Sequence, residues 1–137
     1  QVLADIVHPV GDVGACIASG SYQDTAMIIA PCSMHSLAEI AHGLSSNLLT
    51  RSADVMLKER RPLTLMVRET PLHAIHLQNM AQLAQLGVTI LPPVPAFYHK
   101  PQTIAEMVDH TVGRALQSVG IATDLVPEWQ GIASNTK

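Results

Sequence analysis

Charged side chains stand at both ends of one apolar run in the segment LKERRPLTLMVRETPLH, residues 57–73. Lys58, together with two arginines, precedes PLTLMV, and Arg68 and Glu69 follow it. Arginine and lysine bind phosphate or carboxylate groups, and a glutamate can move protons when burial raises its pKa. Because only 14% of the residues are charged, this grouping predicts an anion site at the rim of a sheet. A mutual ion pair of Arg68 with Glu69, and an ordinary solvated helix end, are the alternatives.

The segment PCSMHS, residues 31–36, offers a second group of polar contacts. It places Ser33 and Ser36 at the expected start of a helix, where unpaired backbone N–H groups and the helix dipole favour an anion, most often phosphate. The alternative is that Ser33 only caps its own helix. A helix start can also lower the pKa of a thiol such as Cys32, but a packing role is favoured because no base or second cysteine is nearby.

The proline-rich segment PPVPAFYHKP, residues 92–101, offers a third group. Its prolines stiffen a loop that presents Phe97 and Tyr98, an arrangement typical of a pocket wall. Arg51 and Arg114 are isolated cations beside apolar stretches, so each needs an anionic partner.

His73 and His76 have the i, i+3 spacing of metal ligands, but no third ligand is nearby in the sequence. We therefore predict a helix-surface or cap role for both histidines, and no metal site.

The elements that must position these residues follow from the hydrophobic pattern. Short apolar runs predict strands at 25–31, 62–69 and 88–94, and 3.6-residue periodicity predicts helices after Ser33, at 73–87 and at 103–120. In the helix at 73–87 the pattern points four side chains inward, namely Ile75, Met80, Leu83 and Leu86. Alternating strands and helices with short connections predict a doubly wound parallel α/β sheet with right-handed crossovers. The carboxyl ends of its strands would bring the three polar segments together.

Composition limits the class of protein. The 137 residues suit one domain, 1–137, and the hydrophobic fraction of 47% with few aromatic residues predicts an aliphatic core. The net charge of −3 gives no support for a nucleic-acid surface, and no apolar run is long enough to cross a membrane. Two cysteines are too few for a disulfide scaffold, which suggests the reducing cytoplasm.

Several blocks together resemble one family. PCSM, LAEIAHG, NLLTRSADV, LKERRPL, VRETPLH, HLQNM, PPVPAFYHKP and EWQG are similar to the UbiX-type flavin prenyltransferases from about Val2 to Gly131. Members have also been called aromatic-acid or 3-octaprenyl-4-hydroxybenzoate decarboxylases. The resemblance implies a Rossmann-like flavoprotein fold of three α/β/α layers and a homo-oligomer, expected to be a dodecamer. It implies transfer of a dimethylallyl group from dimethylallyl phosphate to reduced FMN, without a metal. The prenylated FMN would serve a partner, a UbiD-type decarboxylase.

The resemblance also assigns roles to individual residues. The FMN-binding residues would be Ser33, Met34, His35, Ser36 and Arg68. The residues that bind the prenyl donor would be Tyr98, Arg114, Arg51, Lys58, Ser19, Gly20 and Trp129. Glu69 would move protons around the flavin, and Lys58 would act on the departing phosphate. His35 stands where the family commonly has a lysine, which would remove one charge and leave the backbone contacts.

The sequence departs from the family at its start. Family members begin with a strand and a Gly-Ala-Ser-Gly turn for the FMN phosphate, so roughly two strand–helix units, on the order of 50–60 residues, are expected to be missing. The alternative function is therefore an FMN-binding but non-catalytic subunit, or a truncated remnant, associated with an aromatic-acid decarboxylase. A related flavoprotein cysteine decarboxylase is disfavoured, because LKERR and PAFY belong to the prenyltransferase pattern.

Overall fold

The structure is a computed structural model that describes residues 3–23 and 26–126. The chain divides into two compact units, Gln1–Pro93 and Val94–Lys137, and each is described by itself. The single domain predicted for residues 1–137 remains a prediction.

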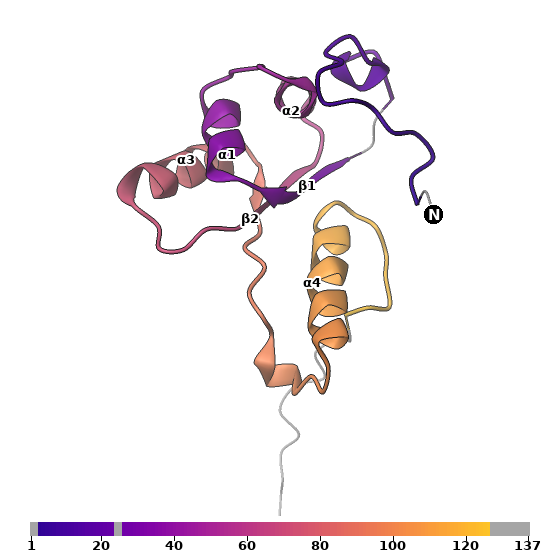
Figure 1. The fold of residues 1–137 in the computed structure, drawn as a ribbon, viewed down its shortest axis with the longest axis vertical. Helices are drawn as coiled ribbons and strands as arrows, with labels where there is room; N and C mark the ends of the chain where they lie inside the picture. Colours follow the sequence, from indigo (N-terminus) through magenta and orange to yellow (C-terminus); the bar gives the residue numbers. More distant parts are fainter. Residues whose placement is uncertain (1–2, 24–25, 127–137) are drawn as a thin grey trace, which may run out of the picture. The chain divides into compact units, whose positions relative to one another are not determined.

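A parallel sheet forms the centre of the first unit (Figure 1). Its strands are β1 (Met27–Cys32), β2 (Leu63–Val67) and β3 (Thr89–Ile90), in the order β1-β2-β3. Both neighbouring pairs are parallel. The predicted parallel sheet with helical crossovers is therefore confirmed.

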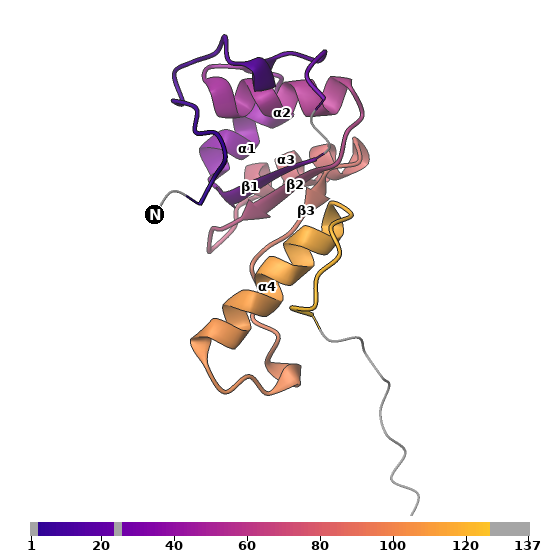
Figure 2. The same ribbon diagram turned by 90° about the vertical axis from the view of Figure 1, so that its right-hand side faces the viewer.

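The connections are α1 (Met34–Ala41) and α2 (Leu48–Lys58) between the first two strands, and α3 (Ala74–Gln85) between the last two. These helices lie on one face of the sheet (Figure 2), as two right-handed crossovers in the same direction require. The 3-10 helix η1 (Cys16–Ala18) precedes β1 and packs against α2 through Ala15, Ala18 and Leu48.

The aliphatic core lies between the sheet and these helices. Leu65 of β2, Leu37 of α1 and Leu83 of α3 are each 0% exposed. Burying one such side chain stabilises the fold by about 2 kcal/mol. This core fixes the carboxyl ends of β1 and β2, where the polar segments begin.

Two details of the strands differ from prediction. Pro31 lies inside β1 rather than ending it, because the register shifts between Ile29 and Cys32 and the proline needs no ladder N–H there. The third strand ends at Ile90, earlier than predicted, because Pro92 and Pro93 have no N–H to donate. The last ladder-like bond is made by the Leu91 N–H, which donates to Leu65 O at 2.9 Å.

Helix α3 buries a narrower stripe than its pattern predicts. Leu83 is fully buried and Met80 half-buried, but Ile75 and Leu86 are exposed, and Asn79 is buried instead. The inward orientation predicted for Ile75 and Leu86 is wrong for the described chain, because the pattern identifies apolar positions and not the neighbours that cover them.

The second unit contains the 3-10 helix η2 (Phe97–His99) and helix α4 (Ile104–Ser118). Thr103 caps α4 by accepting a hydrogen bond from the Glu106 N–H at 3.1 Å, and the predicted helix is confirmed. Within α4 only Gly113 and Ala115 are buried. None of the helices in the described parts of the chain has the length and hydropathy needed to cross a membrane.

Candidate functional site

Two of the predicted polar segments begin side by side at the edge of the sheet. Cys32, the last residue of β1, pairs in register with Val67, the last residue of β2. The Arg68 N–H donates to Cys32 O at 3.4 Å. Ser33 and Arg68 therefore leave the sheet from adjacent strand ends, as the topology predicts.

The start of α1 has the geometry of a capped helix. Ser33 Oγ accepts a hydrogen bond from the Ser36 N–H at 3.1 Å and donates to Ser36 Oγ at 3.2 Å. Its role as a cap is thus confirmed. Capping uses one N–H of the first turn, so the N–H groups of the preceding residues stay available to an anion. His35 projects outward and pairs with Glu39 at 3.4 Å on the helix surface.

Arg68 and Glu69 are both exposed at this edge. Glu69 Oε1 accepts a hydrogen bond from the Thr70 N–H at 3.0 Å. Within residues 3–23 and 26–126, no ion pair joins Glu69 to Arg68, so the mutual ion pair considered from the sequence is not formed. Both charged groups face solvent and are accessible to a ligand.

Cys32 is a packing residue. Its side chain is 0% exposed, its Sγ donates to Ser33 O at 3.6 Å, and burial raises the pKa of its thiol to about 11. The lowered thiol pKa considered from the sequence is therefore wrong, because removal from water disfavours the thiolate more than the helix start favours it.

A second group of predicted residues meets at the end of α2. Lys58 Nζ lies 3.4 Å from Glu59 Oε1, and this pair lies against the turn that contains Ser19 and Gly20. A Cβ built on Gly20 would be 3.1 Å from Lys58 Nζ and would collide with the Glu59 carboxylate. Ser19 Oγ in turn lies 2.8 Å from Ser21 Oγ. The structure therefore brings Ser19, Gly20 and Lys58 together.

Arg51 lies earlier on α2 and is half-buried. Its Nη1 is 3.6 Å from Asp54 Oδ2, which satisfies the expectation that this cation has an anionic partner. Exposed pairs of this kind contribute about 0–1 kcal/mol, so they leave the guanidinium able to bind a stronger anion.

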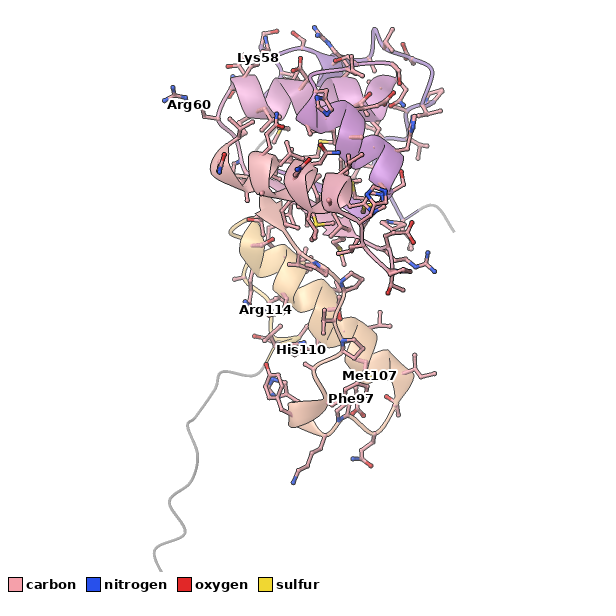
Figure 3. All side chains as sticks on the ribbon, turned by 90° about the vertical axis from the view of Figure 1, so that its left-hand side faces the viewer. Lys58, Arg60, Phe97, Met107, His110 and Arg114 are labelled. Carbon is pink, nitrogen blue, oxygen red and sulfur yellow. The ribbon has the colours of Figure 1, made fainter. Side chains whose placement is uncertain are left out.

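The third group lies in the second unit (Figure 3). The Tyr98 ring is edge-on to His110 of α4, with centroids 6.4 Å apart, and His99 lies 4.8 Å from His110. Arg114 follows His110 by one helical turn and donates from Nη1 to Gln117 Oε1 at 3.0 Å. Burial, and then the charges of His99 and Arg114, lower the pKa of His110 and so favour its neutral imidazole.

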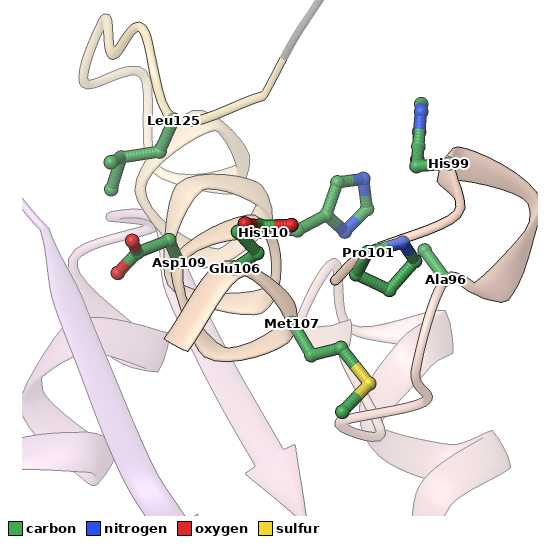
Figure 4. A pocket seen from close by; sticks show the side chains of 8 residues that line it. All are labelled: Ala96, His99, Pro101, Glu106, Met107, Asp109, His110 and Leu125. Carbon is green, nitrogen blue, oxygen red and sulfur yellow. The ribbon is translucent and has the colours of Figure 1, made fainter. Parts of the chain in front are cut away.

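A hollow of about 290 Å³ opens beside this group (Figure 4). It is lined by Ala96, His99, Pro101, Glu106, Met107, Asp109, His110 and Leu125. Phe97 and Tyr98 are 69% and 67% exposed and are not among the lining residues. The proline-framed loop thus forms a pocket wall as predicted, but with the residues beside its two aromatic rings rather than with the rings themselves.

His73 and His76 stack on each other at the start of α3, with ring centroids 3.5 Å apart. Among the residues that the structure describes, no three His, Cys, Asp or Glu side chains are placed to hold a metal ion. Trp129 lies outside the described residues.

Comparison with known proteins gives the family. A family model described as Flavoprotein matches residues 10–122. The flavin prenyltransferase UbiX of Neisseria meningitidis serogroup B is 57% identical over 131 residues, covering 96% of this chain and 69% of the relative. This chain belongs to the UbiX flavin prenyltransferase family. The UbiX of Escherichia coli K12 is 52% identical over 133 residues, covering 96% and 70% of the two chains.

Solved UbiX structures confirm the Rossmann-like α/β fold. AnUbiX (PadA1), crystallised in complex with FMN and dimethylallyl pyrophosphate, has a TM-score of 0.91 and 47% identity, covering 94% of this chain and 69% of that one. A dodecameric FMN-dependent UbiX-like decarboxylase from Escherichia coli O157:H7 has a TM-score of 0.90 and 46% identity, covering 93% and 69%.

Sequence reasoning missed two contacts of the predicted site residues, one in each unit. Arg61 donates from its side chain to the Gly20 and Tyr22 carbonyls, across a separation that no local pattern reveals. His110 meets Tyr98 and lies beside Arg114. The spacing of His110 and Arg114, i and i+4 on one helix face, is a signal that could have found it.

Proposed function

We propose that this chain acts in a flavin prenyltransferase that moves a dimethylallyl group from dimethylallyl phosphate to reduced FMN. The observation that supports this best is 57% identity to a UbiX flavin prenyltransferase over 96% of the chain. The related structure AnUbiX holds dimethylallyl pyrophosphate, which has the same allyl group attached to an anionic leaving group.

The proposed FMN site is at the carboxyl ends of β1 and β2. Ser33, Met34, His35 and Ser36 would hold it through the first turn of α1, and Arg68 from the adjacent strand end would contact it. The N–H groups of that turn and the exposed guanidinium provide donors for an anionic, carbonyl-rich ligand. Reduced FMN, when bound, supplies the electron-rich ring that accepts the prenyl group.

The departing phosphate would be bound by Lys58, Arg51, Tyr98 and Arg114. Transfer breaks the allylic C–O bond, and the electron pair leaves on phosphate. Cations held near that oxygen stabilise the charge as it develops. Within the described residues, the ion-pair partners of Lys58 and Arg51 are the partly exposed carboxylates of Glu59 and Asp54. Such pairs are worth about 0–1 kcal/mol, so a phosphate dianion can compete for both cations.

Glu69 would move the proton that the flavin gives up. Its carboxylate is exposed and accepts only one hydrogen bond in the described chain, from the Thr70 N–H, so it has capacity to accept a proton. Ser19, Gly20 and Trp129 would line the path of the prenyl tail. Exclusion of water there would protect the reactive allyl group until it meets the flavin.

We further propose a homo-oligomer, as in the dodecameric relative, in which neighbouring subunits help to close the site. A UbiD-type decarboxylase would use the product, and the cytoplasm would be the compartment.

The test is the mass of the flavin product. The full-length protein is incubated anaerobically with reduced FMN and dimethylallyl phosphate, and the molecular mass of the extracted flavin is measured by mass spectrometry. We expect a flavin heavier than FMN by one dimethylallyl group. Arg60→Asn should keep this activity, and Lys58→Gln should reduce it strongly. Bound but unmodified FMN in the unsubstituted protein would instead support the non-catalytic subunit.

A further inference from the structure

Arg61 joins the end of α2 to a turn about forty residues earlier in the chain. Its Nη1 donates to Tyr22 O and its Nη2 to Gly20 O, both at 2.8 Å. Charge-assisted hydrogen bonds of this kind are stronger than neutral ones, and a planar guanidinium that makes two of them fixes an orientation as well as a distance. Both terminal nitrogens of the guanidinium therefore donate to backbone carbonyls.

The backbone after α2 places Arg61 at this point. The Arg60 N–H donates to Leu57 O at 3.1 Å, and the Arg61 N–H donates to Met56 O at 2.9 Å. With Arg60 in the left-handed region at φ 54°, these bonds form a Schellman motif, although glycine is the usual residue there. The motif reverses the chain and returns the Arg61 backbone to the last turn of α2. The Arg60 side chain projects away from the helix (Figure 3).

The turn that Arg61 holds is the one that lies against Lys58. The Tyr22 N–H donates to Ser19 O at 3.1 Å, which closes the turn, and Gly20 is in contact with the Lys58–Glu59 pair. Arg61 and Lys58 thus reach the same turn from one helix end. The arginine binds its carbonyls, and the lysine lies against its glycine.

We propose that Arg61 is a positioning residue for prenyl transfer, which fixes the Ser19–Tyr22 turn against Lys58 and does not itself bind phosphate. This proposal rests on the proposed function, since Ser19, Gly20 and Lys58 matter through that reaction. It also changes the role expected for the basic segment KERR, residues 58–61. Of its three cations, Lys58 faces the turn, Arg61 holds the turn, and Arg60 has no side-chain partner within the described residues.

The test compares Arg61→Met, which removes the donors, with Arg61→Lys, which keeps the charge but has a single donating nitrogen in place of the two-pronged guanidinium. Arg60→Asn is the matched control, because it removes a neighbouring charge and asparagine tolerates a positive φ. In the full-length protein, Arg61→Met should raise hydrogen exchange in residues 17–23 about tenfold and lower kcat about tenfold. The affinity for FMN should stay unchanged, because the FMN residues lie at the strand ends. Arg61→Lys should recover part of both losses, and Arg60→Asn should match the unsubstituted protein.

Unchanged exchange and kcat in Arg61→Met would overturn the proposal, as would an equal loss of kcat in Arg60→Asn. A parallel loss of FMN affinity and thermal stability in Arg61→Met would mean a general structural role and would also overturn it. If Arg61→Met does not fold, Arg61→Lys is measured instead: it should show smaller changes in the same direction in hydrogen exchange of residues 17–23 and in kcat, and no change in either would overturn the proposal. Failure of the unsubstituted protein to make prenylated flavin would instead reject the proposed function, and the exchange reading would still test whether Arg61 holds the turn.

Discussion

The two units of the chain differ in how they use their apolar residues. The first unit buries leucines from its sheet and helices in one continuous core. The second has a well-capped helix, α4, but its apolar residues Ile104, Val108 and Val112 lie exposed on one side of it. A helix end is specified locally by its cap, whereas a buried face needs a neighbour. The first unit therefore contains its own stabilising contacts, whereas the contacts within residues 94–126 of the second are mainly local.

The largest contrast should come from equivalent truncations in the two units. Leu65→Ala removes a fully buried side chain from β2 and should lower the free energy of unfolding by about 3 kcal/mol. Val108→Ala removes methyl groups from an exposed position of α4 and should change it by less than about 0.5 kcal/mol. Urea denaturation of each variant measures both. Equal losses would contradict the contrast between the units.

A smaller loss is expected where Gly113 packs against residues 125–126 in the second unit. A Cβ on Gly113 would lie 2.5 Å from Val126 Cγ2 and 2.9 Å from Leu125 Cβ. Gly113→Ala would gain about 1 kcal/mol of helix propensity, but the overpacking costs about 1–3 kcal/mol. We expect a net loss of about 1 kcal/mol, measured by urea denaturation. A gain in stability would mean that residues 125–126 do not pack against α4.

Helix caps should matter equally in both units, because they act locally. Asn47 caps α2 in a capping box with Thr50, and Thr103 caps α4. Alanine at either cap should cost about 1 kcal/mol of unfolding free energy. Circular dichroism during urea titration reports both losses. A cost at Asn47 with none at Thr103 would show that the second unit is not held even by its local bonds.

The last prediction concerns the two thiols of the first unit. Cys16 is exposed and Cys32 is buried, with a pKa raised to about 11. At pH 8, iodoacetamide should label Cys16 and leave Cys32 protected, as read by peptide mass. Below pH 9.0, the ordinary pKa of a thiol, Cys32 is protonated in both the folded and the unfolded protein, so it does not change the free energy of unfolding with pH. Between pH 9.0 and about 11 only the unfolded thiol ionises, so the free energy of unfolding should fall as the pH rises. Rapid labelling of Cys32 at pH 8 would contradict its burial.

Sequence patterns predicted what depends on neighbours along the chain. The parallel strands, the Ser33 cap and the meeting of Ser33 with Arg68 all follow from periodicity, helix-start chemistry and topology. The pattern did not predict the exposure of Ile75 and Leu86, because periodicity identifies an apolar face of a helix but not the elements that pack against it.

Contacts between distant segments were also out of reach. Arg61 binds a turn about forty residues away, and nothing in LKERR distinguishes its role from that of Arg60. Only the αL conformation of Arg60, which glycine normally adopts more easily, separates the directions of the two side chains. The resemblance assigned Lys58 and Gly20 to one site, and the structure supplies the contact between them.

The most direct test of the account is a crystal structure of the full-length protein with FMN and dimethylallyl phosphate bound. The account predicts the flavin against Ser33–Ser36 and Arg68, with the phosphate within hydrogen-bonding distance of Lys58, Tyr98 and Arg114, from one protomer or from two. A phosphate bound by other side chains, with these three turned away from it, would contradict the account.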